Sequence, residues 1–234
     1  MNLHIIIHES FEAPAAIEVW ALQRHHNITY THLYEGDTLP SVPNCDFLVV
    51  MGGPQSPATT TEESPHFDGP KEKAFIKAAV EQGAYVLGVC LGAQLIGDAL
   101  GGTFEHSPNR EIGVFPADLT EEGSQDPNLG QLPATFMVGH WHGDMPGLTP
   151  GATILATSKG CPRQIVRYTP KVYGFQCHFE FTPRAIEGLI THCTDVLEQY
   201  KDQPYVESPA QLRAHDYTEM NELLFSFLDR FTTS

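Results

Sequence analysis

Cys90 stands where a thiol could act as a nucleophile. It lies between two apolar segments, with Gly88 and Gly92 two residues away on either side. A sharp turn from a strand into a helix needs glycines at such positions, because larger side chains would clash within the turn. The turn would lift the thiol into solvent at a helix N-terminus, whose free N–H groups favour a thiolate. A buried structural cysteine is the alternative, and the paired glycines favour the nucleophile.

A thiol nucleophile needs a base and a group that orients the base, and His178 and Glu180 could supply both. They follow the strand-like run from Val172 to Phe175. Residues two apart in an extended chain face the same side, so the imidazole and the carboxylate can point together. An isolated His-x-Glu pair is more often an exposed polar pair. Together with a cysteine at a tight turn, it predicts a Cys-His-Glu triad.

Gly52 and Gly53 could supply part of an oxyanion hole. They directly follow a nearly continuous apolar run from Cys45 to Met51. Two glycines let the backbone approach a ligand closely, so the N–H of Gly53 could face a developing oxyanion. The amide of Leu91, directly after the thiol, would be the second donor. Without the other two motifs, an ordinary strand-ending turn would explain these glycines equally well.

The first hundred residues must position these groups, and they alternate between strand-like and helix-like segments joined by short links. This alternation is typical of an α/β domain with a parallel sheet. We expect strands at 3–7, 28–34, 45–51 and 84–89. We expect helices from Pro14 onward and at 71–82 and 91–100, with a long surface loop at 55–69.

The pattern changes after residue 103, where short strand-like pieces alternate with turns. We expect an antiparallel extension of the same sheet, built from 112–116, 134–138, 153–157, 164–168 and 172–177. Two helices should follow, at 183 to about 200 and from about 209 to 231. The fold class predicted is therefore α/β, with a mostly parallel central sheet flanked by helices. One domain would span 1–234, with a core of about 3–200 and a C-terminal helical extension of about 201–234.

Composition excludes several classes of protein. The 234 residues include 13 basic and 29 acidic ones, a net charge of −16 that would repel a nucleic-acid backbone. The best candidate for a membrane span, the uncharged stretch from Ala84 to Gly97, is shorter than the roughly 20 residues that a span needs. No basic segment precedes the short apolar run near the N-terminus, so we expect a cytoplasmic protein without a signal peptide. Five cysteines without a C-x-x-C pair predict neither a disulfide framework nor a zinc site.

The segment from His140 to Asp144 contains two histidines, His140 and His142, that would share one face of an extended chain. Paired histidines can begin a metal site, but no third ligand lies at a suitable spacing, so we expect no metal. The remaining histidines, such as His25 and His26, are expected at the surface.

Three motifs in this chain resemble the signatures of class I, triad-type glutamine amidotransferases. They are the segments 51–54 (MGGP), 88–94 (GVCLGAQ) and 176–180 (QCHFE). The resemblance is strongest to stand-alone proteins related to the glutaminase domain of GMP synthase. It implies a flavodoxin-like fold, an enzyme without a cofactor, and glutamine or another γ-glutamyl compound as substrate.

The resemblance also implies roles for individual residues. Cys90 would attack the side-chain amide of glutamine, His178 would transfer the protons and Glu180 would orient His178, while Gly53 and Leu91 would bind the oxyanion. Further substrate contacts are implied for Gln94, Trp141 and His142. The segment from His142 to Asp144 corresponds to a loop in the relatives.

Two departures from the family pattern leave the function open. Cys177 and Phe179 stand where the family usually has Phe and Pro, and both should point away from the site. No synthase domain is expected in the roughly fifty residues after Glu180, so a partner chain would have to accept the ammonia. The alternatives are a free-standing γ-glutamyl hydrolase or peptidase, and a non-enzymatic protein of the same fold.

Overall fold

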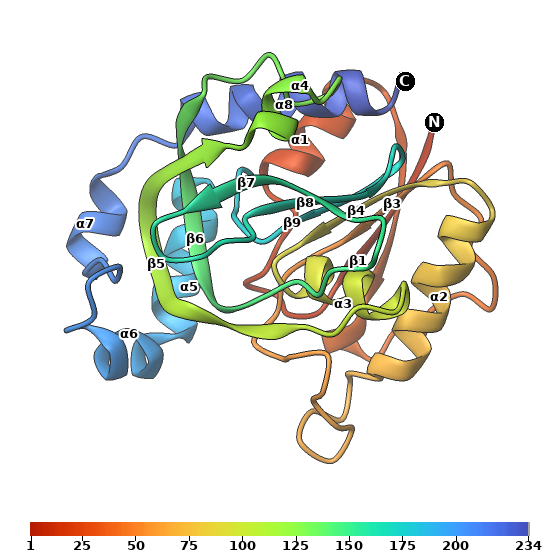
Figure 1. The fold of residues 1–234 in the computed structure, drawn as a ribbon. Helices are drawn as coiled ribbons and strands as arrows, with labels where there is room; N and C mark the ends of the chain where they lie inside the picture. The colour runs from red at the N-terminus through yellow and green to blue at the C-terminus, as the bar shows by residue number, and fades with distance from the viewer. Residues whose placement is uncertain (234) are drawn as a thin grey trace.

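A single nine-stranded sheet runs through the protein, parallel at one end and antiparallel at the other (Figure 1). The computed structural model describes residues 1–233. The strands are β1 (Asn2–Ile7), β2 (Asn27–His32), β3 (Phe47–Val50), β4 (Tyr85–Val89), β5 (Glu105–Leu119), β6 (Thr135–Met145), β7 (Thr153–Ser158), β8 (Ile165–Thr169) and β9 (Val172–Phe175). Their order is β2-β1-β3-β4-β9-β8-β7-β5-β6. Neighbours from β2 to β9 are parallel and those from β9 to β6 antiparallel, which confirms the predicted α/β fold class.

Helices cover both faces of the parallel strands (Figure 1). They are α1 (Ala16–Gln23), α2 (Gly69–Glu81), α3 (Leu91–Ala99), α4 (Glu121–Gln125), α5 (Pro183–His192), α6 (Thr194–Tyr200), α7 (Pro209–Ala214) and α8 (Thr218–Phe231), with a 3-10 turn at Leu33–Glu35. Along β1, Leu3 and Ile5 belong to the core under α1 and α8, whereas Ile6 belongs to the core under α2 and α3. Alternate residues face opposite sides of a strand, so both faces must be apolar, and this produces the continuous apolar runs seen in the sequence.

The C-terminal helix α8 is part of the main core. The rings of Phe227 and Phe231 are fully buried, and Phe231 packs edge-on against Phe47 of β3 and Tyr173 of β9. The predicted C-terminal helical extension therefore packs against the central strands. Among residues 1–233, no helix combines the length and the apolar character that a membrane span requires.

Two predicted helices are wrong in extent, because each is interrupted. The helix expected over 183–200 breaks at Cys193, whose backbone leaves the helical region (φ −115°, ψ 31°). The helix expected over 209–231 breaks at His215, which is extended (φ −75°, ψ 147°). The carboxylate of Asp216 then accepts the backbone N–H of Thr218 and starts α8. Such side-chain hydrogen bonds compete with helix continuation.

Strand lengths also differ from the predictions. The second strand ends at His32, two residues early, because a 3-10 turn follows. β5 and β6 are much longer than predicted and pair along most of their length, apart from a register shift between His106 and Glu111. As a result, the segment from His142 to Asp144 lies in β6 and not in a loop.

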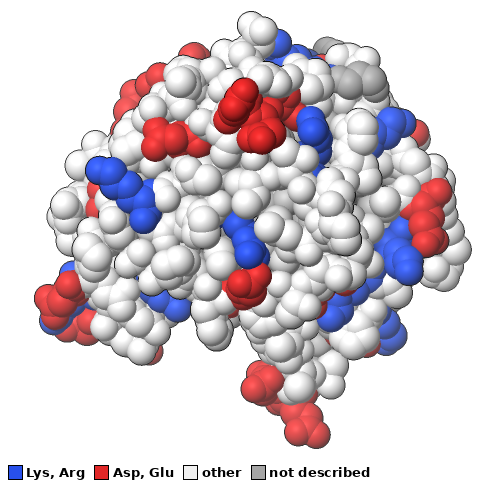
Figure 2. Space-filling view, in the orientation of Figure 1, with Lys and Arg blue, Asp and Glu red and all other residues white. Residues whose placement is uncertain are grey.

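Charged side chains are spread over the surface. Figure 2 shows acidic and basic groups interspersed on one face of the described chain, without a continuous basic area on that face. Several of the basic groups are paired, for example Arg163 with Glu105 (2.6 Å) and Arg167 with Asp126 (2.5 Å).

Candidate active site

The three sequence motifs meet at one edge of the sheet. β3, β4 and β9 are parallel neighbours, so their carboxyl ends lie side by side. Gly52 and Gly53 follow β3, Cys90 follows β4, and His178 lies three residues beyond β9. In open α/β sheets, ligands bind outside the carboxyl ends of the strands. The strand order thus brings together groups that are 88 residues apart in sequence.

Cys90 occupies a strained turn between β4 and α3. Its backbone has φ 52° and ψ −108°, a conformation rare for any residue except glycine. A Cβ atom on Gly88 would lie 2.4 Å from the backbone of Gly92, and one on Gly92 would lie 2.0 Å from the carbonyl oxygen of Val50. Both clashes involve backbone, so only glycine fits at either position. The turn therefore has the geometry expected of a nucleophile elbow.

The Cys90 side chain is more covered than the sequence predicts. The residue is 7% exposed rather than lifted into solvent, and its Sγ lies 3.7 Å from the carbonyl oxygen of Trp141. β6, which carries Trp141, covers the elbow. A covered thiol is shielded from bulk water, which strengthens electrostatic interactions within the site.

His178 is placed to act on this thiol. Its Nδ1 lies 2.6 Å from Oε1 of Glu180, and its buried Nε2 has no hydrogen-bond partner among residues 1–233. Burial lowers the pKa of His178, but the Glu180 carboxylate and the neighbouring Cys90 sulfur raise it well above its ordinary value. The imidazole therefore has one nitrogen held by a carboxylate and the other left open next to the thiol.

The His178 segment is held from two sides. The backbones of His178 and Gly139 in β6 exchange two hydrogen bonds (2.8 and 3.1 Å), and the His178 ring stacks on Phe181 with centroids 4.2 Å apart. The side-chain amide of Asn221 in α8 donates to the carbonyl oxygens of Phe179 (2.7 Å) and Phe181 (3.0 Å). The C-terminal helix thus helps to fix the His178 segment.

The two residues that depart from the family pattern pack into the core. Cys177 and Phe179 are 0% and 1% exposed, and Phe179 contacts the rings of Phe136 and Phe175. The sulfur of Cys177 lies 3.6 Å from the carbonyl oxygen of Gln164, so both side chains that replace the family's Phe and Pro are engaged with other parts of the core.

The proposed oxyanion donors lie next to each other. A Cβ on Gly53 would be 3.0 Å from Cδ2 of Leu91, so the two residues are in contact. The Gly53 N–H has no hydrogen-bond acceptor within the described part of the chain. Leu91 is the first residue of α3, whose N–H has no partner inside the helix. Both amides are therefore free to bind a ligand.

His8 and Glu72 form a buried pair behind Gly52, and the sequence did not single out either residue. Nδ1 of His8 lies 3.0 Å from the Gly52 carbonyl oxygen, and Nε2 lies 2.8 Å from Oε1 of Glu72 in α2. The expectation that the remaining histidines lie at the surface is wrong for His8 and for His4, which are 0% and 7% exposed. His4 belongs to β1 and His8 directly follows it, and the side chains of β1 are buried on both faces of the sheet.

Glu12 is a further acidic group that sequence reasoning missed. It lies in the loop after β1, and its Oε2 would be 2.6 Å from a Cβ on Gly52. Burial raises the pKa of Glu12 to about 7, with smaller opposing effects from His178 and Glu180. A carboxyl group that titrates near neutral pH therefore borders the thiol and the oxyanion loop. No local pattern around Glu12 indicates this position.

The three predicted substrate contacts lie in different surroundings. Gln94 is buried, donates from Nε2 to Gln176 (3.1 Å), and has a side-chain oxygen without a partner among residues 1–233. Trp141 presents its carbonyl oxygen to the Cys90 sulfur. His142 turns its Nε2 toward Glu111 (3.3 Å) within a buried polar cluster, so that nitrogen is already engaged.

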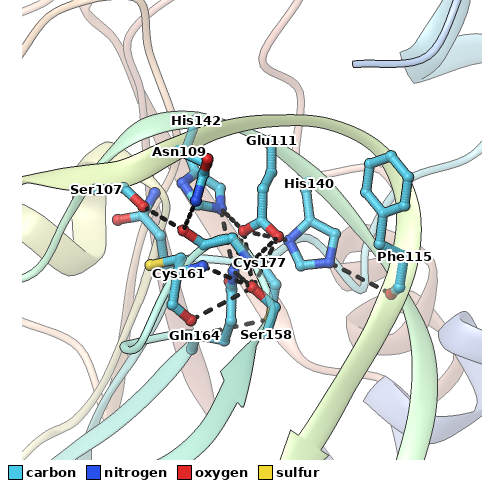
Figure 3. Close-up of polar contacts among 12 residues, drawn as sticks. Ser107, Asn109, Glu111, Phe115, His140, His142, Ser158, Cys161, Gln164 and Cys177 are labelled. Atoms are coloured by element: carbon cyan, nitrogen blue, oxygen red, sulfur yellow. Dashed lines mark hydrogen bonds and ion pairs between the residues drawn. The ribbon is translucent and has the colours of Figure 1, made fainter. Parts of the chain in front are cut away.

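Figure 3 shows this polar cluster around Glu111. The carboxylate accepts hydrogen bonds from the Ser158 hydroxyl, the Gly160 backbone N–H and the Gln164 side-chain amide. Burial raises the pKa of Glu111, but the hydrogen bonds from His142 and Ser158 and the electrostatic effect of the two imidazoles outweigh it. The pKa of Glu111 therefore lies below its ordinary value, and the carboxyl stays ionised. Burial lowers the pKa of His140 to about 3 and also lowers the pKa of His142, so both rings are neutral at pH 7.

The cluster also corrects the expectation that His142 has no companion ligands. Glu111 and Cys161, which come from other segments, place ligand-type atoms within 4.8 Å of each other and of His142. Sequence spacing could not show this, because the three residues are brought together only by strand pairing. Both carboxylate oxygens of Glu111 already accept hydrogen bonds from neutral donors.

Comparison with known proteins identifies the family. The family model described as glutamine amidotransferase class-I matches residues 2–192. The chain belongs to the class-I glutamine amidotransferase family. A glutamine amidotransferase-like protein of Salmonella typhimurium, YfeJ, is 49% identical over 235 residues, covering 99% of this chain and 98% of that protein. The glutamine-hydrolyzing GMP synthase of Lactobacillus acidophilus is 37% identical over 100 residues, covering 42% of this chain and 19% of the synthase.

Solved structures agree with this assignment. The crystal structure of SMU.1228c has a TM-score of 0.97 and 45% identity, covering 99% of this chain and all of that one. A glutamine amidotransferase from Methylobacillus flagellatus has a TM-score of 0.87 and 25% identity, covering 99% of this chain and 94% of that one. The protein thus has the flavodoxin-like fold of glutamine amidotransferases, and family membership supports glutamine amide hydrolysis in general terms.

Proposed function

We propose that this protein hydrolyses the side-chain amide of glutamine through a γ-glutamyl thioester on Cys90. The observation that carries the proposal is the arrangement of His178, whose Nδ1 is held by Glu180 while its Nε2 is left without a partner beside the thiol. A thiol nucleophile, a base and a group that orients the base are the three parts that such chemistry requires.

Acylation would proceed as follows. Nε2 of His178 takes the thiol proton, and the sulfur of Cys90 attacks the amide carbon of glutamine. The carbonyl oxygen becomes an oxyanion that accepts hydrogen bonds from the N–H groups of Gly53 and Leu91. The C–N bond then breaks, and His178 returns the proton to the leaving nitrogen, so that ammonia departs. Glu180 keeps the imidazolium oriented throughout.

Deacylation would repeat these steps with water. His178 removes a proton from water, the hydroxide attacks the thioester carbon, and the same two amides hold the second oxyanion. The C–S bond breaks, the thiolate regains its proton from His178, and glutamate is released. Gln94 and Trp141 would contact the substrate. We place His142 in a supporting role behind Trp141, because its Nε2 is engaged with Glu111.

The ammonia can pass to an acceptor on a partner chain or be released. The GMP synthase relative is named as glutamine-hydrolyzing, which is consistent with transfer of ammonia to an acceptor, here on a partner chain. A free-standing γ-glutamyl hydrolase would use the same triad and the same thioester. Faster release of larger amines than of ammonia, without any partner, distinguishes this second possibility.

The test is the release of glutamate from L-glutamine by wild-type protein and by two cysteine variants. Cys90→Ala should abolish turnover. Cys45→Ala removes a partly exposed thiol next to the opposite end of β3, and it should leave the rate within about twofold. Full turnover in Cys90→Ala would show that the nucleophile is misassigned.

A panel of γ-glutamyl amides assayed without a partner identifies the substrate class. Faster turnover of γ-glutamyl peptides than of glutamine favours a peptidase, whereas glutamine turnover that rises on addition of a synthase favours an amidotransferase. If no γ-glutamyl compound is cleaved and no adduct forms on Cys90, the protein is a non-enzymatic member of the family.

A further inference from the structure

The peptide unit between Gly52 and Gly53 carries both a held group and a free group. Its carbonyl oxygen, on Gly52, lies 3.0 Å from Nδ1 of His8. Its N–H, on Gly53, is the proposed oxyanion donor and has no acceptor in the described chain. A trans peptide is planar, with C=O and N–H pointing in opposite directions, and none of the described peptides is cis. Holding the oxygen therefore sets the direction of the N–H.

This peptide needs an external constraint. It joins two glycines, whose backbone torsions are the least restricted of any residue, so it could rotate at low cost. His8 supplies the constraint through its contact with the Gly52 carbonyl oxygen. Its side chain is completely buried, and the ring also contacts Phe67, with centroids 5.8 Å apart. Little room remains for the imidazole to turn.

The hydrogen-bond partners of His8 determine its protons. The carbonyl oxygen of Gly52 can only accept, so Nδ1 must carry a proton. On the other side, Nε2 lies 2.8 Å from the carboxylate of Glu72, and that contact also requires a proton. Burial lowers the pKa of His8, but Glu72, the Gly52 carbonyl and the more distant Glu12 together raise it. The ring is thus an imidazolium paired with the Glu72 carboxylate, which is itself 1% exposed.

We propose that His8 and Glu72 are positioning residues that lock the Gly52–Gly53 peptide with its N–H directed at the oxyanion. The imidazolium also polarises the peptide that it binds, which makes the Gly53 N–H a stronger donor. The inference rests on the proposed function, because it assigns the pair to the oxyanion of that reaction. It extends the function by adding a second buried histidine–glutamate pair that never touches the substrate.

Two rates measured on the same thiol separate positioning from general structural support. Hydrolysis of glutamine passes through an oxyanion, whereas alkylation of Cys90 by iodoacetamide displaces iodide and forms none. His8→Ala should lower kcat for glutamine by about 10²-fold, as the loss of one oxyanion donor does. The same variant should change the alkylation rate of Cys90 by less than about twofold.

Conservative variants and a matched control complete the experiment. His8→Asn places an amide N–H near the position of Nδ1 and should recover about tenfold of the lost kcat. Glu72→Gln keeps the ring but removes its charge partner, and it should lose about tenfold. His4→Asn changes another buried histidine, in β1, whose ring nitrogens bond to the hydroxyls of Thr29 and Thr31. This variant should leave kcat within twofold.

An NMR measurement on wild-type protein keeps the inference independent of activity. Imidazole ¹⁵N signals should show both nitrogens of His8 protonated at pH 7.5, whether or not glutamine is turned over. A neutral His8 ring, or equal loss of both rates in His8→Ala, would overturn the inference. Unchanged glutamine turnover in His8→Ala and in Glu72→Gln would do the same. Absence of turnover in wild-type protein would instead contradict the proposed function and leave the NMR result to decide on the pair.

Discussion

Two buried histidine–glutamate pairs flank the Cys90 turn, and they differ in what is left free. In the pair of His178 and Glu180, one ring nitrogen is bound, and the other faces the thiol without a partner among the described residues. In the pair of His8 and Glu72, both ring nitrogens are bound, one of them to the oxyanion peptide. The first arrangement suits proton transfer and the second suits fixation. Unused hydrogen-bonding capacity, more than burial or charge, separates the two roles.

A third carboxylate, Glu111, shows that a neighbouring glutamate does not by itself charge a histidine. Its oxygens are saturated by neutral donors such as Ser158 and Gln164, and the nearby His140 and His142 remain neutral because burial lowers their pKa values. Glu72 has no such set of donors, and one of its oxygens has no partner within residues 1–233. It therefore depends on His8.

Removal of the free imidazole should have the largest effect. His178→Ala should lower kcat/KM for glutamine by about 10²- to 10⁴-fold, because the general base and acid is lost. Steady-state glutamate release measures this change. His8→Ala retains the base, so it should lose less than His178→Ala does. A loss below roughly tenfold for His178→Ala would remove it from the reaction.

A change in Glu180, the partner of His178, should lower the activity less than the loss of His178 does. Glu180→Gln leaves the imidazole in place but removes the carboxylate that raises its pKa, and we expect a loss of about 10- to 100-fold. Because the pKa of His178 then falls, the pH dependence of alkylation of Cys90 should also shift. An unchanged alkylation profile would mean that the two side chains are not coupled.

Glu12 should affect the pH dependence more than the maximal rate. With a pKa of about 7 it is mostly neutral at pH 6 and mostly ionised at pH 8, where its charge opposes an oxyanion beside Gly52. The ratio of kcat/KM in Glu12→Gln to that in wild type should therefore rise about threefold or more from pH 6 to pH 8. Glu9→Gln, in the same loop, serves as the control. A flat ratio would place Glu12 outside the reacting centre.

The smallest effect is expected from the support that α8 provides. Asn221→Ala removes the donor to the carbonyl oxygens of Phe179 and Phe181, at a cost of about 1–2 kcal/mol in the free energy of unfolding. We expect kcat to fall by a few fold, with KM little changed. Chemical denaturation and steady-state kinetics measure the two effects, and loss of stability without loss of rate would show that α8 does not hold the His178 segment.

The sequence predicts features that are determined locally. The turn at Cys90 is recognisable because its two glycines are required by contacts within a few residues, and the parallel strands because burial on both faces demands continuous apolar runs. The same reasoning brings His178 and Glu180 to one side of the chain. The three motifs follow the family's chain order, and the structure brings them together at one edge of the sheet.

What the sequence could not show depends on contacts between distant segments. His8 and Glu72 are 64 residues apart, and no local sequence pattern predicts that they form a buried, charged pair. A histidine directly after an apolar strand is a weak signal, and it becomes informative only when the neighbouring strand is known to carry Gly52. The covering of Cys90 by β6 also arises from tertiary packing. The single-domain description stays a prediction.

Labelling with a glutamine analogue that carries a diazoketone tests the central claim most directly. Peptide mass spectrometry should find one covalent adduct, on Cys90, and its formation should be slowed by excess glutamine and by His178→Ala. The other four cysteines should remain unmodified. An adduct on another residue while Cys90 stays free, in protein that still hydrolyses glutamine, would contradict the assignment of Cys90 as the nucleophile.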